Sequence, residues 1–504
     1  MSQQQQQQPQ PQGPDYLPKP IQHEKHLKYR PRYKPGDTFW GVGIEREFYL
    51  ESAAVAVVSR RDILARTKRE RYSVDYYTSY KPGAYKAAVE GLLDDGEEIE
   101  IPILINSHAL ARTDVFGTHQ TTYEREPKPN PRFSGETIFE RLMRLVPEFF
   151  VDEYDQHFYF DGDAVEILTQ NFYKATVEDA VEELIQYKTL FLDYANAALE
   201  DARPFERNLP LAWAEKNYGF AQMYTNPGGI SIFNNGTYQF NLTAPTTLNA
   251  QGQIADVAGF VSRHQRIIRA FQWIEPFLIA IYGSGDPLAA GPHGYKFAKG
   301  SQRSAMSRYI GVGTYDSQRM ENGKMLTISA EELPAEFWYE EYHKESGYQP
   351  LRQLGLDINF NKHLNHGIEF RIFEWFPESC LLDLLKTLVY LMDQAGGQRE
   401  IPDPRTSAVW NRVVARAVQS GPFLTIWKGE LAVFSGALGL SLGGFEIRDI
   451  WRRLQRGLKR WANRGECSRV MIRRKPSWFD HLRCTTAAAV SVSVSEPAAP
   501  HNRS

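Results

Sequence analysis

The stretch GVGIEREFYL, residues 41–50, decides how this chain folds. Successive side chains of a β-strand point to opposite faces of its sheet, so Ile44 and Phe48 share one face while Glu45 and Glu47 share the other. Both carboxylates therefore project together from a segment whose opposite face is apolar. The pattern predicts a strand that buries one face in the core and presents charge on the other.

Three later stretches repeat this arrangement: FDGDAVEILT (160–169), GTYQFNLTAP (236–245) and HGIEFRIFEWF (366–376). If the four strands adjoin in one curved sheet, glutamates from three strands, two amides and an arginine converge on one concave face. A protein holds divalent cations beside a phosphate with such a set of side chains. The polar residues are Glu45, Glu47, Glu166, Gln239, Asn241, Glu369 and Arg371.

A simpler explanation of the alternation is an antiparallel sheet with one solvated face, which needs no function. Two features weigh against it. Glu, Gln and Asn are not favoured in strands, where Thr solvates a face at a lower cost in propensity. The four strand cores also contain no Lys, so most of these carboxylates lack an obvious neutralising partner in the sequence, and a bound cation would supply one.

The four stretches resemble the signature strands of the carboxylate-amine ligase superfamily, which includes glutamine synthetase, glutamate-cysteine ligase and other amidoligases. GIEREF (43–48) resembles the Glu-x-Glu of its first strand, DGDAVEIL (161–168) its Asp-Gly strand, and GIEFRIF (367–373) its final Glu-x-Arg strand. The third strand departs from the family, because Gln239 and Asn241 stand where histidines are expected.

The resemblance covers about residues 36–395 and implies both a fold and an activity. The implied fold is α+β, with a curved antiparallel sheet of the glutamine synthetase-like half-barrel type backed by helices and an appended C-terminal helical segment. The implied activity is an ATP- and magnesium-dependent ligase that joins a glutamate-like carboxylate to an amine through an acyl phosphate. Manganese can replace magnesium, and the amine can belong to a small molecule, a protein or a peptide.

Two alternatives to a ligase stay open. One is a catalytically silent binding or scaffold protein that retains the ligase fold, which the amides at Gln239 and Asn241 support. The other is a metal-dependent hydrolase, in which the same ligands activate water. Turnover of ATP without an added amine would favour the hydrolase.

The resemblance also implies roles for individual residues. Phosphoryl transfer concentrates negative charge, which carboxylate-held magnesium and an arginine offset. The basic residues come from a glycine-rich segment, residues 283–313, whose other interpretation is a solvated surface loop, and the chain contains no P-loop. The implied metal ligands are Glu45, Glu47, Glu166 and Glu369, the implied catalytic residues are Arg371, Glu369 and Arg308, and the implied cofactor-binding residues are Lys299, Arg303, Gln239 and Asn241.

Apolar residues at helical spacing predict helices after three of these strands, at about residues 176–194, 254–282 and 381–392. Thr176 with Asp179 three residues later is close to a capping box and marks the start of the first helix. Strands followed by helices describe an α+β layer with helices on one face of the sheet. The apolar stripe of the first helix comprises Val177, Val181, Leu184, Leu190, Phe191 and Tyr194.

Beyond these helices, the residues from Ile447 to Trp461 also show helical spacing, with arginines and lysines mostly opposite the apolar stripe. A basic amphipathic helix can contact nucleic acid or another anionic surface, or it can pack its stripe on the catalytic domain. Packing is the favoured interpretation.

Composition divides the chain into four parts. The Gln- and Pro-rich beginning and the low-complexity end cannot bury enough apolar surface to fold. The parts are a disordered leader (1–35), a catalytic domain (36–398) with an insertion at about 52–150, a helical basic segment (399–484) and a disordered tail (485–504).

The overall composition sets the environment that is expected for the chain. With 504 residues and 42% apolar content, the chain can bury a large core, and a formal charge of -3 creates no global field for nucleic acid or membrane. Three cysteines without a pairing pattern indicate a reducing compartment. Since the sequence shows neither a signal peptide nor a membrane span, a cytoplasmic location is expected.

Overall fold

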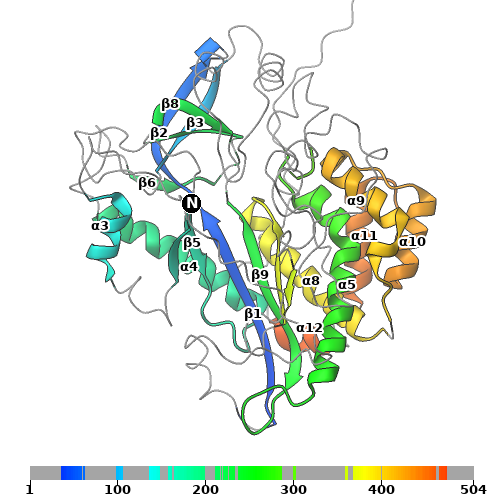
Figure 1. Ribbon diagram of the computed structural model, residues 1–504. Helices are drawn as coiled ribbons and strands as arrows, with labels where there is room; N and C mark the ends of the chain where they lie inside the picture. Colours follow the sequence, from blue (N-terminus) through cyan, green and yellow to red (C-terminus); the bar gives the residue numbers. More distant parts are fainter. Residues whose placement is uncertain are drawn as a thin grey trace, which may run out of the picture.

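The computed structural model describes the chain between Lys34 and Arg473, with gaps (Figure 1). It contains two β-sheets and a group of helices, so the predicted α+β class with antiparallel strands is confirmed at that level. The described residues are 34, 36–59, 61–62, 98–105, 136–147, 157–161, 164–198, 210–215, 217, 219–224, 226–232, 236–285, 299–301, 358–360, 367–398, 400–460 and 465–473.

The main sheet has six strands in the order β10-β11-β9-β1-β5-β4, and every neighbouring pair is antiparallel. Its edge strands, β10 and β4, do not pair with each other, so the described sheet is open rather than a closed barrel. The long strands β1 and β9 lie side by side at its centre (Figure 1). The bounds are β1 Thr38–Phe48, β4 Phe158–Asp161, β5 Ala164–Leu168, β9 Tyr238–Thr247, β10 Ile358–Phe360 and β11 Ile368–Phe373.

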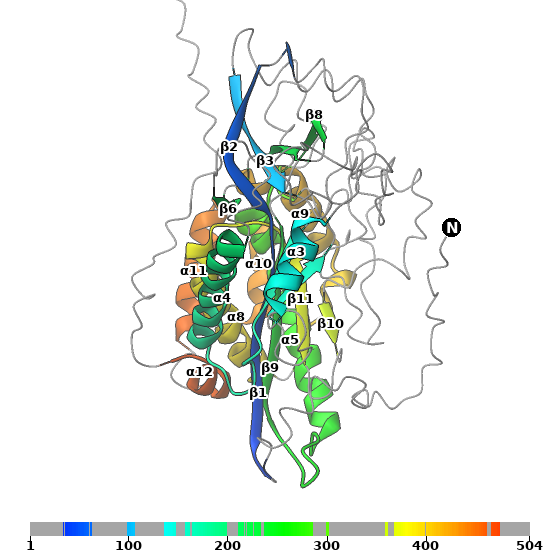
Figure 2. The same cartoon turned by 90° about the vertical axis from the view of Figure 1, so that its left-hand side faces the viewer.

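A second sheet continues from the end of β1, as Figure 2 shows. Its strand order is β6-β2-β3-β7-β8, and its pairs are antiparallel except for the parallel pair β3 and β7. The segment interpreted as an insertion supplies β3, most of β2 and the helix α3 (Ile138–Leu145). The strands are β2 Leu50–Ser59, β3 Glu98–Ile105, β6 Leu211–Trp213, β7 Phe220–Met223 and β8 Asn226–Ile232.

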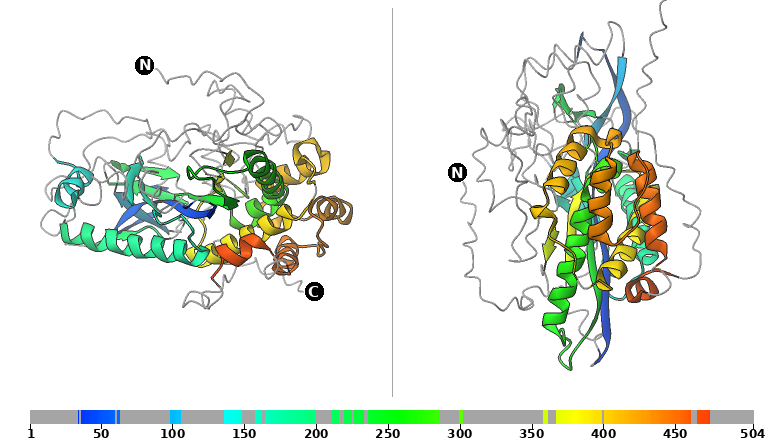
Figure 3. Two further views of the ribbon diagram at one scale, coloured as in Figure 1. Left: turned by 90° about the horizontal axis from the view of Figure 1, so that it is seen from below. Right: turned by 90° about the vertical axis from the view of Figure 1, so that its right-hand side faces the viewer.

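The apolar face of the main sheet packs against helices, and α4 runs along it in the left view of Figure 3. Phe158 of β4 lies 5.0 Å from Phe191 of α4, and Phe370 of β11 stacks on Phe271 of α5 at 5.2 Å between ring centroids. The three predicted helices are therefore confirmed. They are α4 (Val177–Ala198), α5 (Val257–Tyr282) and α8 (Leu381–Gly396).

The start of α4 has the predicted cap. The backbone N–H of Asp179 donates to Thr176 Oγ1 at 3.2 Å, and the backbone N–H of Thr176 donates to Asp179 Oδ2 at 3.0 Å. The far end of the stripe was predicted wrongly, because Tyr194 is 40% exposed. The adjacent Ala195 is buried in its place, so the buried face of the helix shifts by one residue near its end.

The C-terminal helices pack on α5 and α8. Ile450, Trp451 and Leu454 of α11 are buried, and the Trp451 ring meets Tyr282 of α5 edge to face at 5.7 Å. Packing of the apolar stripe is therefore confirmed. The remaining elements are α9 (Ala408–Ser420), α10 (Lys428–Leu438), α11 (Ile447–Lys459), α12 (Glu466–Met471) and the 3-10 turns η5 (Glu378–Cys380), η6 (Pro404–Thr406) and η7 (Gly421–Phe423).

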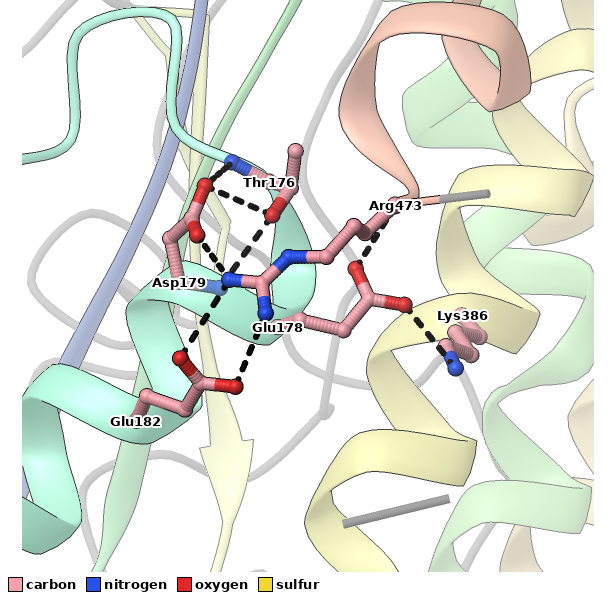
Figure 4. A network of polar contacts seen from close by, with 6 residues as sticks. All are labelled: Thr176, Glu178, Asp179, Glu182, Lys386 and Arg473. Carbon is pink, nitrogen blue, oxygen red and sulfur yellow. Dashed lines mark hydrogen bonds and ion pairs between the residues drawn. The ribbon is translucent and has the colours of Figure 1, made fainter. Parts of the chain in front are cut away.

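An ion-pair network ties the chain that follows α12 to α4 and α8 (Figure 4). Glu178, which is fully buried, pairs with Lys386 Nζ of α8 at 2.9 Å and accepts the backbone N–H of Arg473 at 2.8 Å. The Arg473 guanidinium pairs with Glu182 at 3.0 Å and with Asp179. Segments almost 300 positions apart in sequence are thereby held together.

Two further observations concern the cysteines and the membrane. Among the described cysteines, Cys380 is buried, and Cys467 is buried and free. Among the described helices, none combines the length and the apolar character that crossing a membrane requires.

Asp179 makes the stability of this network dependent on pH. Burial, the largest influence, raises the pKa of Asp179, but hydrogen bonds from Thr176 and Arg473 together outweigh it and leave the pKa below its ordinary value. The stabilisation is therefore present above the unfolded pKa of about 3.9 and is lost as the pH falls through the lower folded pKa.

We expect Asp179→Asn to lower the free energy of unfolding at pH 7 by up to about 1 kcal/mol, since the side chain is half exposed and its ion pair is screened. Urea denaturation at pH 7 and below pH 3 should show this difference shrinking in acid. Asp193→Asn, an exposed position on the same helix, is the control. An equal loss at both pH values would contradict the electrostatic explanation.

Candidate functional site

The register of the main sheet brings the polar residues of four adjacent strands onto one face. Directly opposed residues of an antiparallel pair share a face. Glu47 of β1 is opposite Glu166 of β5, and Glu45 is opposite Gln239 of β9. The prediction that these strands adjoin is therefore confirmed. We call the set Glu45, Glu47, Glu166, Gln239, Asn241, Glu369 and Arg371 the polar face.

The polar face continues onto β11. Asn241 of β9 is opposite Glu369, and Arg371 follows two residues later on the same strand. Arg371 Nη1 lies 3.7 Å from Glu369 Oε1, which is an ion-pair distance and too long for a hydrogen bond. The pair keeps a permanent positive charge beside a carboxylate that is fully buried.

Burial differs across the polar face. Glu369 is fully buried and Gln239 is 4% exposed, so the β9 and β11 side is largely shielded from solvent. Glu45, Glu47 and Glu166 are partly buried. Charges interact more strongly where water is excluded. A positive charge or hydrogen-bond donor of a ligand would therefore be bound more strongly on the β9 and β11 side than on the β1 and β5 side.

The amides of β9 present unused acceptors. Asn241 Nδ2 donates to Glu45 Oε1 at 2.8 Å, which fixes the orientation of the amide and turns its oxygen away from Glu45. Asn241 Oδ1 and Gln239 Oε1 are buried and have no hydrogen-bond partner among the described residues. Because a buried acceptor without a donor costs about 1–3 kcal/mol, these oxygens indicate a ligand that supplies donors or positive charge.

The donor set of the polar face fits magnesium in a limited way. All candidate ligands are oxygens, as hard divalent cations prefer. Within the described part of the chain, no three His, Cys, Asp or Glu side chains are grouped so as to hold a metal ion by themselves. Magnesium in phosphoryl-transfer proteins is commonly bound by one or two carboxylates together with substrate phosphates, and the opposed Glu47 and Glu166 can supply such a pair.

The predicted phosphate-binding residues are only partly described. Lys299 is exposed, and its backbone N–H donates to the Gln419 carbonyl at 3.0 Å, so this residue is anchored to the end of α9 rather than to a strand of the main sheet. Arg303 and Arg308 lie outside the described residues. Their proposed contacts with phosphate stay predictions.

A buried ion-pair network behind the polar face was not anticipated from the sequence. Arg46, which is 3% exposed, points to the helix side between the rings of Phe48 and Tyr238, at 4.0 and 4.2 Å from their centroids. Its Nη1 donates to Glu378 Oε2 at 2.8 Å. Lys188 of α4 donates to the same oxygen at 3.0 Å. The network joins β1, α4 and the turn before α8.

The sequence does contain a signal for Arg46. The same alternation that groups Glu45 with Glu47 assigns Arg46 to the apolar face, where a charged side chain needs a partner. The partner, Glu378, is 332 positions away, so the sequence cannot identify it. Arg46 is therefore the residue that holds β1 with its two glutamates directed away from the helices.

A glycine allows β9 to approach β1 beside Glu47. Gly236 has φ +71°, and a Cβ atom at this position would lie 2.1 Å from the Glu47 carbonyl oxygen. The next residue, Thr237, accepts the Glu47 backbone N–H through its carbonyl at 3.1 Å. The backbone around Glu47 is thus fixed independently of the side chains on the polar face.

Comparison with known proteins identifies one relevant relative. No model of a known protein family matches the chain. The chain is 38% identical over 452 residues to "Uncharacterized protein R704" of Acanthamoeba polyphaga mimivirus. The alignment covers 88% of this chain and 79% of the mimivirus protein, and the name of that protein assigns it no activity.

We expect Arg46→Met to lower the free energy of unfolding by about 3 kcal/mol, because it removes one member of a buried ion pair. Glu378 retains Lys188 and partial exposure, which limits the loss. In a double-mutant cycle measured by urea denaturation, Arg46→Met and Glu378→Gln should couple by at least about 1 kcal/mol. Additive effects would show that the two side chains do not interact.

Proposed function

The chain belongs to the same family as the mimivirus protein, and we propose that it is an ATP- and magnesium-dependent ligase that joins a carboxylate to an amine through an acyl phosphate. One observation carries the proposal. Four strands that resemble the signature strands of carboxylate-amine ligases adjoin as β11-β9-β1-β5, with their polar residues on one face. The open antiparallel sheet backed by helices supports kinship with the glutamine synthetase-like fold.

The carboxylates of the polar face would hold magnesium. Glu47 and Glu166 are directly opposed on neighbouring strands, so both carboxylates can reach one cation. Glu45, two residues before Glu47 on β1, and Glu369 of β11, which is opposite Asn241, are the further ligands in this proposal. Bound magnesium would neutralise the charge on the transferring phosphoryl group.

Arg371 is proposed to contact the phosphoryl oxygens. A guanidinium presents paired N–H donors that match two oxygens of a phosphate, and Arg371 is held beside the buried Glu369. Lys299, Arg303 and Arg308 would assist as phosphate contacts. These residues stabilise negative charge and do not exchange protons with the substrate.

The proposed reaction has two steps. An oxygen of the substrate carboxylate attacks the γ-phosphorus of ATP, and the bond from that phosphorus to the bridging oxygen of ADP breaks. An ammonium first releases one proton to solvent to give the neutral amine. Its nitrogen then attacks the acyl carbon, the bond from that carbon to the phosphate oxygen breaks, and the nitrogen loses a second proton to the departing inorganic phosphate. A carboxylate is a poor acyl donor, and the first step provides it with a leaving group. The acid is proposed to be glutamate-like, as in the ligases that the strands resemble.

A catalytically silent scaffold is the second candidate, favoured by the amides of Gln239 and Asn241 at positions where the ligases carry histidines. Thermal melting with magnesium and ATP separates the two, since a protein that binds a ligand only when folded is stabilised by it. A ligase should be stabilised by magnesium-ATP. A scaffold without the site should melt at the same temperature with and without it.

We expect Glu47→Gln to leave the fold intact and to abolish the stabilisation by magnesium-ATP, because it removes one ligand charge with almost no change in volume. Calorimetric titration of magnesium-ATP into the full chain should show at least a tenfold loss of affinity, which is about 1.4 kcal/mol. Glu446→Gln, an exposed carboxylate at the start of α11, is the control. Unchanged affinity in Glu47→Gln would show that β1 does not form the site.

Arg371→Lys tests the catalytic assignment. A lysine keeps the charge but cannot grip two oxygens at once, so the rate of ADP formation with acid and amine should fall at least tenfold while magnesium-ATP affinity changes little. If Arg371 only neutralises Glu369, the lysine variant should retain its turnover rate. That result would leave the residue a structural role.

A further inference from the structure

The polar face has two chemically different ends. At one end, Glu47 and Glu166 form an opposed carboxylate pair. At the other end, Asn241 is opposite Glu369, which makes a row of one amide and one carboxylate. The rows are four residues apart along β1, from Gly43 to Glu47, which corresponds to about 14 Å. Gln239, opposite Glu45, lies between the two rows, and we call Gln239, Asn241 and Glu369 the amide end. The face is long enough for two ligands at the same time.

Two buried acceptors of the amide end have no donor among the described residues. Gln239 is more than nine-tenths buried, and its Oε1 has no partner among the described residues. Asn241 Oδ1 is also a buried atom without a hydrogen-bond partner among the described residues. The Asn241 nitrogen donates to Glu45, so a rotation that exchanged the amide nitrogen and oxygen would break that hydrogen bond. The ligand of this end must therefore bring N–H or O–H donors.

Two of the ligands in the proposed reaction fit the amide end poorly. Phosphate oxygens are themselves acceptors and carry negative charge, so they match the Arg371 guanidinium but not the two amide oxygens or the Glu369 carboxylate. Magnesium prefers the end with two carboxylates, since amide oxygens bring no charge to offset its dehydration. The surroundings of Gln239 and Asn241 therefore favour a ligand other than the ATP and magnesium that the resemblance implies for these two residues.

We infer that Gln239 and Asn241 form the binding site of the amine substrate and receive it as a primary ammonium. This inference rests on the proposed ligase function. An ammonium carries one positive charge and three N–H donors, which match two amide oxygens and a nearby carboxylate. Hydrogen bonds from a charged donor are also stronger than those between neutral groups. The amine would then lie on the β9 and β11 side of the phosphoryl group that Arg371 contacts.

The test uses the full chain and two small probes, methylammonium and tetramethylammonium, observed by saturation-transfer NMR. Both probes carry one positive charge, but only methylammonium has N–H donors. Methylammonium should bind and tetramethylammonium should bind at least tenfold more weakly. Equal binding of the two would overturn the inference, because it would show that charge alone is recognised. This comparison needs no variant to fold.

Variants then locate the probe. Gln239→Met and Asn241→Leu keep the side-chain size and remove the acceptors, so each should weaken methylammonium binding at least about tenfold. Magnesium-ATP affinity of Gln239→Met should change less than twofold. Asn241→Leu also removes the hydrogen bond to Glu45, a proposed magnesium ligand, so it is not used for this comparison. Gln186→Met, an exposed glutamine of α4, is the matched control. Loss of magnesium-ATP affinity with unchanged methylammonium binding would instead make the amides cofactor ligands and overturn the inference.

Glu47→Gln separates this inference from the proposed function. Suppose that Glu47→Gln no longer binds magnesium-ATP, and that Gln239→Met and Asn241→Leu bind methylammonium like the parent. The ligase proposal then stands, and the amine site is elsewhere. If Glu47→Gln binds magnesium-ATP like the parent, the proposed function fails whatever the amides bind.

Discussion

The orientation of β1 between β9 and β5 is the constraint on which the rest of the structure depends. This strand sends Ile44, Phe48 and Arg46 to the helix side and Glu45 and Glu47 to the other. A shift of one residue would exchange the two sets and bury both carboxylates against α4. The ion pair between Arg46 and Glu378 opposes such a shift, because it would leave Glu378 without its arginine partner.

The same orientation explains why charge is graded across the polar face. Moving from β5 to β11, the face changes from an opposed pair of carboxylates to amides beside the buried Glu369. The opposed carboxylates at one end suit a divalent cation, and the amide acceptors beside Glu369 at the other suit hydrogen-bond donors. The two proposals therefore describe one surface with two kinds of ligand, held in order by the registers of three strand pairs.

Helices from distant parts of the chain pack on the apolar side of the main sheet, opposite the polar face. Lys188 of α4 contacts Glu378 at the start of α8, and Lys386 of α8 contacts Glu178 at the start of α4. Arg473 adds the segment after α12 to this second contact. The fully buried Glu178 is tolerated because it has two partners, whereas a buried carboxylate without them would be strongly destabilising. The C-terminal helices are therefore part of the support of the main sheet.

The sequence alone determined which residues share a face and where the main helices begin, because alternation in a strand and capping at Thr176 are local properties. It therefore grouped Glu45 with Glu47 and Glu369 with Arg371, but it missed the exposed Tyr194 and the buried ion pair between Arg46 and Glu378. The tertiary structure decided which strands adjoin, how Glu47 came to face Glu166, and how Asn241 reached Glu45 across 196 positions. Such contacts depend on long-range packing and loop closure, for which no local pattern carries information.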